Sequence, residues 1–227
     1  MLDYNNTTTV FLWVLAFYFL PMLISILVER KKLISSTRMV EIGKKFVDPI
    51  TRKIHNWLNK YKLASIQKGN WWFLCLLIFL NNLCLGAFVS RIIYGIIFII
   101  PLFLTVWDGF GHGKVFSNPR VRTGLVLWFF EFGGYLFATA IGVKLGINIF
   151  VSIIKGNKVI IDVPWNYVVL MVLFLFTGAA LETVLVKVAS KNMDLRRIDQ
   201  FDFEKQRKEL AKQLDEDWKG RQFMQEK

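Results

Sequence analysis

The feature that most constrains this chain is a set of long apolar runs with almost no charge. Val10–Val28 and Trp71–Ser90 carry no charged residue, and each approaches the roughly 20 residues that a helix needs to cross a bilayer core. Ile92–Trp107 is shorter and also uncharged, whereas Thr123–Val143 and Val163–Val186 each contain one glutamate. Helices that are apolar on every side would not stay solvated in water. The sequence therefore predicts five membrane helices.

Composition excludes the other common classes of protein. The chain has 227 residues, of which 54% are hydrophobic and 20% are charged, and the charges are concentrated in blocks between the apolar runs. Soluble domains contain fewer apolar residues, and disordered chains contain far fewer. The 2 cysteines are too few for a disulfide framework. We therefore expect an all-α, polytopic membrane helix bundle of about five transmembrane helices with cytoplasmic amphipathic segments.

Basic residues predict the orientation of the chain in the cell membrane. Residues 29–70, 108–122 and 187–227 would lie on one side, and they hold 25 of the 29 Lys and Arg residues. The positive-inside bias assigns that side to the cytoplasm, which places the N-terminus outside and the C-terminus inside. The net charge of +12 then indicates attraction to the anionic lipid of the inner leaflet, and not to nucleic acid.

The predicted organisation has five parts. They are a short external N-terminus (1–9), a first membrane helix (10–28), a basic cytoplasmic amphipathic segment (29–70), a four-helix membrane core (71–188) and a charged cytoplasmic tail (189–227). In the core, the second and third runs meet at Arg91, where we expect a tight turn near residues 90–95. A re-entrant hairpin that does not cross the membrane fully is the alternative for residues 71–107.

Two cytoplasmic segments carry helical patterns with two interpretations each. Apolar residues recur at helical spacing from Ile50 to Tyr61, and Pro49 fits a helix start. That helix would lie on the inner leaflet or pack beneath the bundle. In the tail, Leu210, Leu214 and Trp218 form a short stripe, which would dock a partner or remain a solvated helix.

Polar residues inside the apolar runs are the candidate site. Glu131 is the ninth residue of its predicted helix and so lies near mid-bilayer, Asn81 and Asn82 fall at a similar depth, and Glu182 lies closer to the interface. A contact between an asparagine and Glu131 is geometrically allowed. Glu131 would bind a proton or ion, or would lock helix packing through hydrogen bonds. No buried Lys or Arg is predicted beside it, which favours the packing lock.

Small residues mark the faces on which helices approach closely. These helix-packing residues are Gly134, Ala138, Gly142, Gly146, Gly86 and Gly178. A further motif is expected in the loop where the third helix leaves the membrane, and it consists of Asp108, Gly109, His112 and Gly113. No phosphate-binding, zinc-protease or nucleophile motif is present in the sequence. We therefore expect no catalytic residues, no metal and no cofactor.

Four short segments together resemble the stage II sporulation protein M family. They are Phe79-Leu80-Asn81-Asn82-Leu83, Asp108-Gly109-x-x-His112-Gly113, Glu131 with Gly142-Val143-Lys144-Leu145-Gly146, and Gly178-Ala179-Ala180-Leu181-Glu182. The chain departs from the family pattern around Leu127-Trp128, where the family has His-Gly, and at Asp108, where it has Asn. The resemblance implies an integral membrane protein of bacteria or archaea that serves as a membrane scaffold or subunit. In endospore formers, such a protein anchors cell-wall hydrolases.

Two functions follow as expectations. The first is a non-enzymatic membrane scaffold or complex subunit that binds other membrane or membrane-associated proteins, or a second copy of itself. The alternative is a transporter or permease subunit with an intramembrane polar pathway and an ATPase partner, because the helical layout is similar to membrane components of ABC-2 exporters. An enzyme that acts on lipid ranks last.

Overall fold

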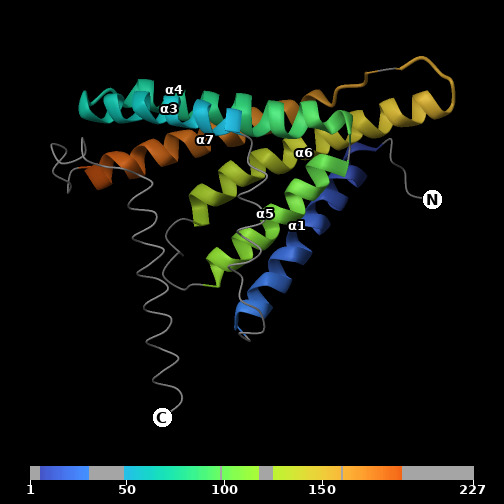
Figure 1. Ribbon diagram of the computed structural model, residues 1–227, viewed down its shortest axis with the longest axis horizontal. Helices are drawn as coiled ribbons and strands as arrows, with labels where there is room; N and C mark the ends of the chain where they lie inside the picture. The colour runs from blue at the N-terminus through green and yellow to red at the C-terminus, as the bar shows by residue number, and fades with distance from the viewer. Residues whose placement is uncertain (1–5, 31–48, 98, 118–124, 160, 191–227) are drawn as a thin grey trace, which may run out of the picture. The chain divides into compact units, whose positions relative to one another are not determined.

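The computed structural model describes residues 6–30, 49–97, 99–117, 125–159 and 161–190, and all of the regular structure in them is helical (Figure 1). The helices in chain order are α1 (Thr7–Arg30), α3 (Pro49–Gln67), α4 (Trp71–Leu80), the π-helix η1 (Asn81–Ile93), the 3₁₀ turn η2 (Tyr94–Ile96), α5 (Ile99–Phe116), α6 (Leu125–Ile154) and α7 (Trp165–Ser190). Most of the basic segment before α3 and nearly all of the predicted tail, including Leu210, Leu214 and Trp218, lie outside the described residues.

Four of the described helical stretches are long and apolar enough to cross a membrane. They are Thr7–Val28, Trp71–Ile96, Leu125–Ile154 and Trp165–Ser190. Many of their large apolar side chains are exposed on the outer surfaces of the helices, as expected where lipid tails take the place of a protein core. The prediction of an all-helical, multi-pass membrane protein is confirmed at this level.

The third predicted span is wrong in its boundaries. The second helical stretch does not turn near residues 90–95, because α4, η1 and η2 together continue to Ile96. Helix α5 therefore begins only at Ile99 and continues to Phe116, which adds Asp108 and His112 to a stretch that had been expected to be uncharged. The α5 helix is not among the four that meet the requirements of length and apolarity.

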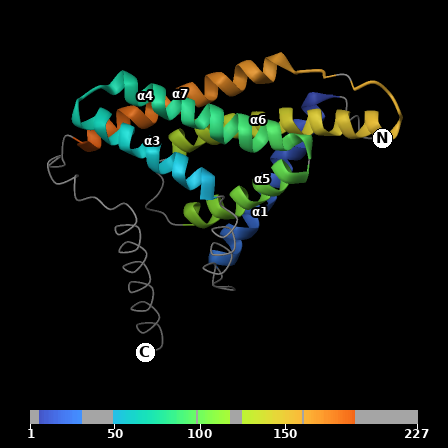
Figure 2. The same cartoon turned by 45° about the horizontal axis from the view of Figure 1, so that its top comes forward.

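Helices α1 and α5 pack in parallel along their lengths (Figures 1 and 2). Two glycines of α5 permit this close approach. A Cβ at Gly109 would lie 2.4 Å from the carbonyl oxygen of Tyr18, and a Cβ at Gly113 would lie 2.4 Å from that of Met22. The Ser25 hydroxyl donates to the Phe110 carbonyl at 2.9 Å and adds a polar contact to the same interface. Small residues thus let two backbones meet where larger ones would separate them.

Helix α6 is the centre of the bundle. It runs parallel to η1, since Gly86 meets the ring of Tyr135 and Gly95 meets the backbone of Gly142. It runs antiparallel to α7, where a Cβ at Gly134 would lie 2.6 Å from the side chain of Leu175. A buried apolar cluster joins α1, η1, α6 and α7, and its members are Val14, Tyr18, Ala87, Phe132, Leu136, Ala138, Ala140, Ile141, Tyr167, Met171 and Leu175.

The C-terminal end of α3 packs against α4. Ile66 contacts the buried cluster that contains Leu74 and Ile78 of α4, and the Ser65 side chain is buried while its hydroxyl donates to the Tyr61 carbonyl. Gly69, with φ of 67°, makes the turn between the two helices. This contact is the one expected of a connector that packs beneath the bundle. Contact with the leaflet surface stays a prediction.

Candidate functional site

A partly open pocket of about 500 Å³ lies between η1, η2, α5 and α6. The wall from η1 and η2 consists of Asn81, Leu85, Gly86, Val89, Ser90, Arg91 and Tyr94. The wall from α5 consists of Asp108 and His112, one helical turn apart. The wall from α6 consists of Leu127, Trp128, Glu131, Phe132 and Tyr135. The ionisable side chains of Arg91, Asp108, His112 and Glu131 therefore share one cavity between apolar helices.

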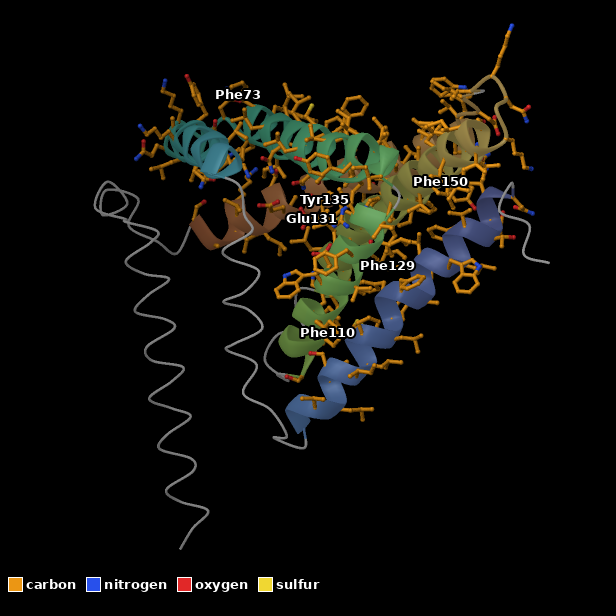
Figure 3. The ribbon with its side chains drawn as sticks, turned by 45° about the vertical axis from the view of Figure 1, so that its right-hand side comes forward. Phe73, Phe110, Phe129, Glu131, Tyr135 and Phe150 are labelled. Atoms are coloured by element: carbon orange, nitrogen blue, oxygen red, sulfur yellow. The ribbon has the colours of Figure 1, made fainter. Side chains whose placement is uncertain are left out.

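The face that α6 presents to the pocket follows from helical periodicity. Trp128, Glu131, Phe132 and Tyr135 stand at positions i, i+3, i+4 and i+7 of α6, so they form one stripe. Figure 3 shows Glu131 and Tyr135 close together in the interior, beneath the η1 ribbon and beside α5. A carboxyl group in the middle of an aromatic stripe thus faces the cavity and does not face lipid.

Glu131 is joined to η1 through an amide. The Nδ2 atom of Asn82 donates to Oε1 of Glu131 at 2.8 Å, and Nδ2 of Asn81 donates to Oδ1 of Asn82 at 3.2 Å. Asn82 is only 7% exposed, so its bond to the carboxyl is shielded from water. The structure thus makes the allowed contact through Asn82, with Asn81 one step behind it at the pocket wall.

Glu131 also faces a second carboxyl group, that of Glu182 on α7. Glu182 interacts electrostatically with Glu131, and Lys62 of α3 contributes a positive charge nearby. Gly178, one turn before Glu182, allows this approach, since a Cβ there would lie 2.8 Å from Cγ of Glu131. Two neighbouring carboxylates repel each other unless they share a proton or bind a cation.

Glu131 lies nearer to the start of α6 as described than to the middle of that helix. Glu131 is the seventh residue of the 30-residue α6 as described, about 9 Å from its start, while the middle of that helix lies at Thr139 and Ala140. Helix α6 continues to Ile154, eleven residues beyond the predicted end at Val143, and this moves its centre away from Glu131.

Arg91 is buried and ion-paired, although the sequence had placed it in an external turn. Its Nη2 atom pairs with Oδ2 of Asp108, and its Nη1 atom donates to Oγ1 of Thr105 and to the carbonyl of Pro101, both at 3.3 Å. The side chain of Arg91 is 8% exposed, and that of Asp108 is 29% exposed, on the pocket side. The Thr105 hydroxyl also approaches that of Thr139 on α6 at 3.4 Å. The polar contacts of Arg91 thus link η1 to α5 and extend to α6.

The motif Asp108, Gly109, His112 and Gly113 does not form a loop. All four residues lie inside α5, because the helix begins seven residues later than predicted and ends at Phe116. Their spacing places Asp108 and His112 on the pocket face and the two glycines against α1. His112 is 3.0 Å from the Tyr18 hydroxyl through Nδ1, and its ring contacts Trp128 and Phe132. A His inside a helix bundle is thereby positioned by aromatic packing.

The helix-packing residues lie at two interfaces of α6. Gly142 has the closest contact, since a Cβ there would lie 2.1 Å from the carbonyl oxygen of Arg91, and Gly95 meets Gly142 itself. Gly86 and Gly134 accommodate the side chains of Tyr135 and Leu175. Ala138 and Gly146 are buried on the same helix. These contacts place η1 close enough to α6 for Asn82 to reach Glu131.

Lys144, which directly follows the predicted span Thr123–Val143, is a second basic residue that the structure buries. Its Nζ atom is 2.7 Å from Oδ2 of Asp162, which precedes α7 and is 65% exposed. Both Arg91 and Lys144 interrupt apolar runs at a single position and have an aspartate 17 or 18 residues further along the chain. A single basic residue within an apolar run, followed by an aspartate at this distance, is the sequence signal that could have indicated that the basic side chain is buried.

The segments that carry the resemblance to the sporulation protein M family meet in space. Asn82 binds Glu131, Gly178 packs against Glu131, and Gly142 packs against Arg91, the partner of Asp108. Among the described residues, no group of three or more His, Cys, Asp or Glu side chains is placed to hold a metal ion. Compared with known protein families, curated proteins and solved structures, the chain gives no match, so membership of that family stays a prediction.

Proposed function

We propose that this chain is the membrane subunit of a transporter or permease, and that the pocket between η1, α5 and α6 receives a polar or charged solute. The observation that carries the proposal is the cavity of about 500 Å³ that Arg91, Asp108 and Glu131 line together. Ionisable side chains in a membrane bundle are costly, and they typically mark substrate or ion pathways. A volume of several hundred Å³ is that of sites for small molecules.

The buried basic residues favour the transporter function over the scaffold function. The packing-lock interpretation of Glu131 depended on the absence of a buried Lys or Arg, and both Arg91 and Lys144 are buried. A carboxyl group that only stabilises helix packing is expected to be enclosed by protein, with hydrogen-bond partners for its oxygen atoms. Glu131 instead lies at the wall of an open cavity. This geometry favours the polar pathway over the scaffold.

The first test is whether polar reagents reach the pocket. Leu85 lines the cavity, whereas its neighbour Cys84 is exposed outside it and would face lipid. In a chain without Cys75, labelling by a charged methanethiosulfonate reagent in proteoliposomes would be compared between Leu85→Cys with Cys84→Ser and the chain that retains Cys84 alone. We expect rapid labelling at position 85 and slow labelling at Cys84. Equal, slow labelling at both positions would contradict a water-accessible pocket.

The scaffold function remains the second expectation from the sequence. Affinity purification in mild detergent tests it directly. A reproducible partner that stays bound when Glu131 is replaced by Gln would support a scaffold. A transporter subunit would instead lose solute binding in that variant.

A further inference from the structure

We infer that the pocket selects an organic monocation, such as a protonated or quaternary amine, through Glu131 and the aromatic stripe of α6. This inference rests on the proposed function and names the class of its solute. It follows from the charge balance of the pocket, from the rings in its wall and from its size, which are taken in turn below.

The charges around the pocket leave an excess of one negative charge. Arg91 is already paired with Asp108, and Lys62, whose positive charge lies near Glu131, is not part of the pocket wall. Of the two carboxyl groups in the wall, that of Asp108 has the Arg91 guanidinium as its partner, whereas that of Glu131 has no lysine or arginine partner among the lining residues. An anion would have to displace Asp108 from Arg91 before it gained a partner. A cation meets the carboxyl group of Glu131 directly.

The pocket wall also contains aromatic side chains beside the carboxyl. Trp128, Phe132 and Tyr135 of α6 and Tyr94 of η2 all line the cavity together with Glu131. Trp128 and Phe132 are stacked with their centroids 6.1 Å apart, and Phe132 and Tyr135 meet edge to face at 6.4 Å. Rings attract an ammonium group that lies over their faces, and the attraction grows when water is excluded. A carboxylate flanked by rings thus recognises charge and apolar bulk at once.

The same wall is a poor cage for a bare metal ion. Calcium and magnesium need six or more oxygen ligands at short range, whereas the pocket wall has two carboxyl groups, and the one on Asp108 is already paired with Arg91. A volume of about 500 Å³ suits an organic ion with apolar substituents.

The test compares three probes of similar size and different charge on the full chain in lipid nanodiscs. They are benzyltrimethylammonium, its uncharged counterpart neopentylbenzene, and benzenesulfonate, each measured by equilibrium dialysis with empty nanodiscs as the baseline. We expect saturable binding of the ammonium ion alone. Glu131→Gln should weaken it roughly tenfold or more, because a bond to a charged group is lost.

Matched variants separate the contributions of charge and ring. Asp162→Asn removes an acid outside the pocket and should leave the affinity within about twofold. Tyr135→Leu should weaken ammonium binding roughly threefold to tenfold, while Tyr135→Phe retains the ring and most of the affinity. Thermal midpoints of all variants in the same nanodiscs exclude simple misfolding.

The outcomes distinguish this inference from the proposed function. Tighter binding of the sulfonate, or ammonium binding unchanged in Glu131→Gln, would overturn the cation inference while the polar pocket itself remained. If no probe bound above the empty nanodiscs and position 85 were also unlabelled, both the inference and the transporter function would fail.

Discussion

Replacing Arg91 by Met and Asp108 by Leu, singly and together, tests the interior ion pair. Breaking a buried pair by removing one partner costs about 3–5 kcal/mol, because an uncompensated charge is left behind. The two single variants should differ. Asp108→Leu leaves a guanidinium that is 8% exposed, whereas Arg91→Met leaves a carboxylate that is 29% exposed toward the pocket, where water can reach it. We expect a loss of about 3 kcal/mol for Asp108→Leu and about 1–2 kcal/mol for Arg91→Met.

The double variant should recover most of the loss, to within about 1 kcal/mol of the parent, because two apolar side chains fill the space without stranding a charge. Reversible unfolding in mixed micelles with increasing sodium dodecyl sulfate, followed by circular dichroism, gives the four free energies of unfolding. The pair of Lys144 and Asp162 serves as a control, and the high exposure of Asp162 predicts a coupling energy below about 1 kcal/mol there. Additive losses at Arg91 and Asp108, or a larger loss for Arg91→Met, would refute the reasoning.

Three further outcomes are expected in the same unfolding assay. Gly142→Ala should lose about 1–3 kcal/mol because its Cβ would lie 2.1 Å from the Arg91 carbonyl, whereas Gly111→Ala, with nothing within 4 Å, should be neutral or gain up to about 1 kcal/mol. Tyr18→Phe should lose about 1 kcal/mol through its bond to His112, while Tyr167→Phe, whose hydroxyl is 3.4 Å from that of Thr8, should stay within about 0.5 kcal/mol. Asn82→Leu should lose about 1–3 kcal/mol because Glu131 loses its amide donor, and equal stability would contradict the contact.

The apolar runs predict the helices well because lipid imposes one requirement on every residue of a span. All backbone groups must be satisfied internally, so a long uncharged run must become a helix. The ends are predicted less well. Arg91 and Lys144 were assigned to the edges of their runs, yet η1–η2 and α6 continue past them to Ile96 and Ile154. A charge ends a span only if it has no partner inside. The partners here, Asp108 and Asp162, come from other segments that a local pattern does not connect to them.

The candidate site was predicted in part. Helical depth alone placed Asn82 and Glu131 at similar heights, and their side chains meet at 2.8 Å. The addition of Asp108 and His112 to the same cavity could not be foreseen, because both were expected in a loop. The approach of Glu182 to Glu131 depends on Gly178 and on the antiparallel packing of α6 with α7. Spacing within one helix gives a face, but the identity of the opposing helix depends on how the whole bundle packs.

The polar cluster around Arg91 has the contacts of a structural pair, whereas the cluster around Glu131 has those of a binding site. Arg91 has Asp108, Thr105 and the Pro101 carbonyl as partners, and it joins neighbouring helices; this is the arrangement expected of a structural pair. Glu131 has one amide donor, faces a like charge and lines an open cavity, so a ligand would complete its contacts.

The roles of the two clusters should therefore be separable by experiment. The double variant of Arg91 and Asp108 should keep ammonium binding within about threefold, since it removes no net charge. Glu131→Gln should instead lose binding while its free energy of unfolding stays within about 1 kcal/mol of the parent, because glutamine still accepts the bond from Asn82. The reverse result, with binding lost in the double variant and unchanged in Glu131→Gln, would exchange the two assignments.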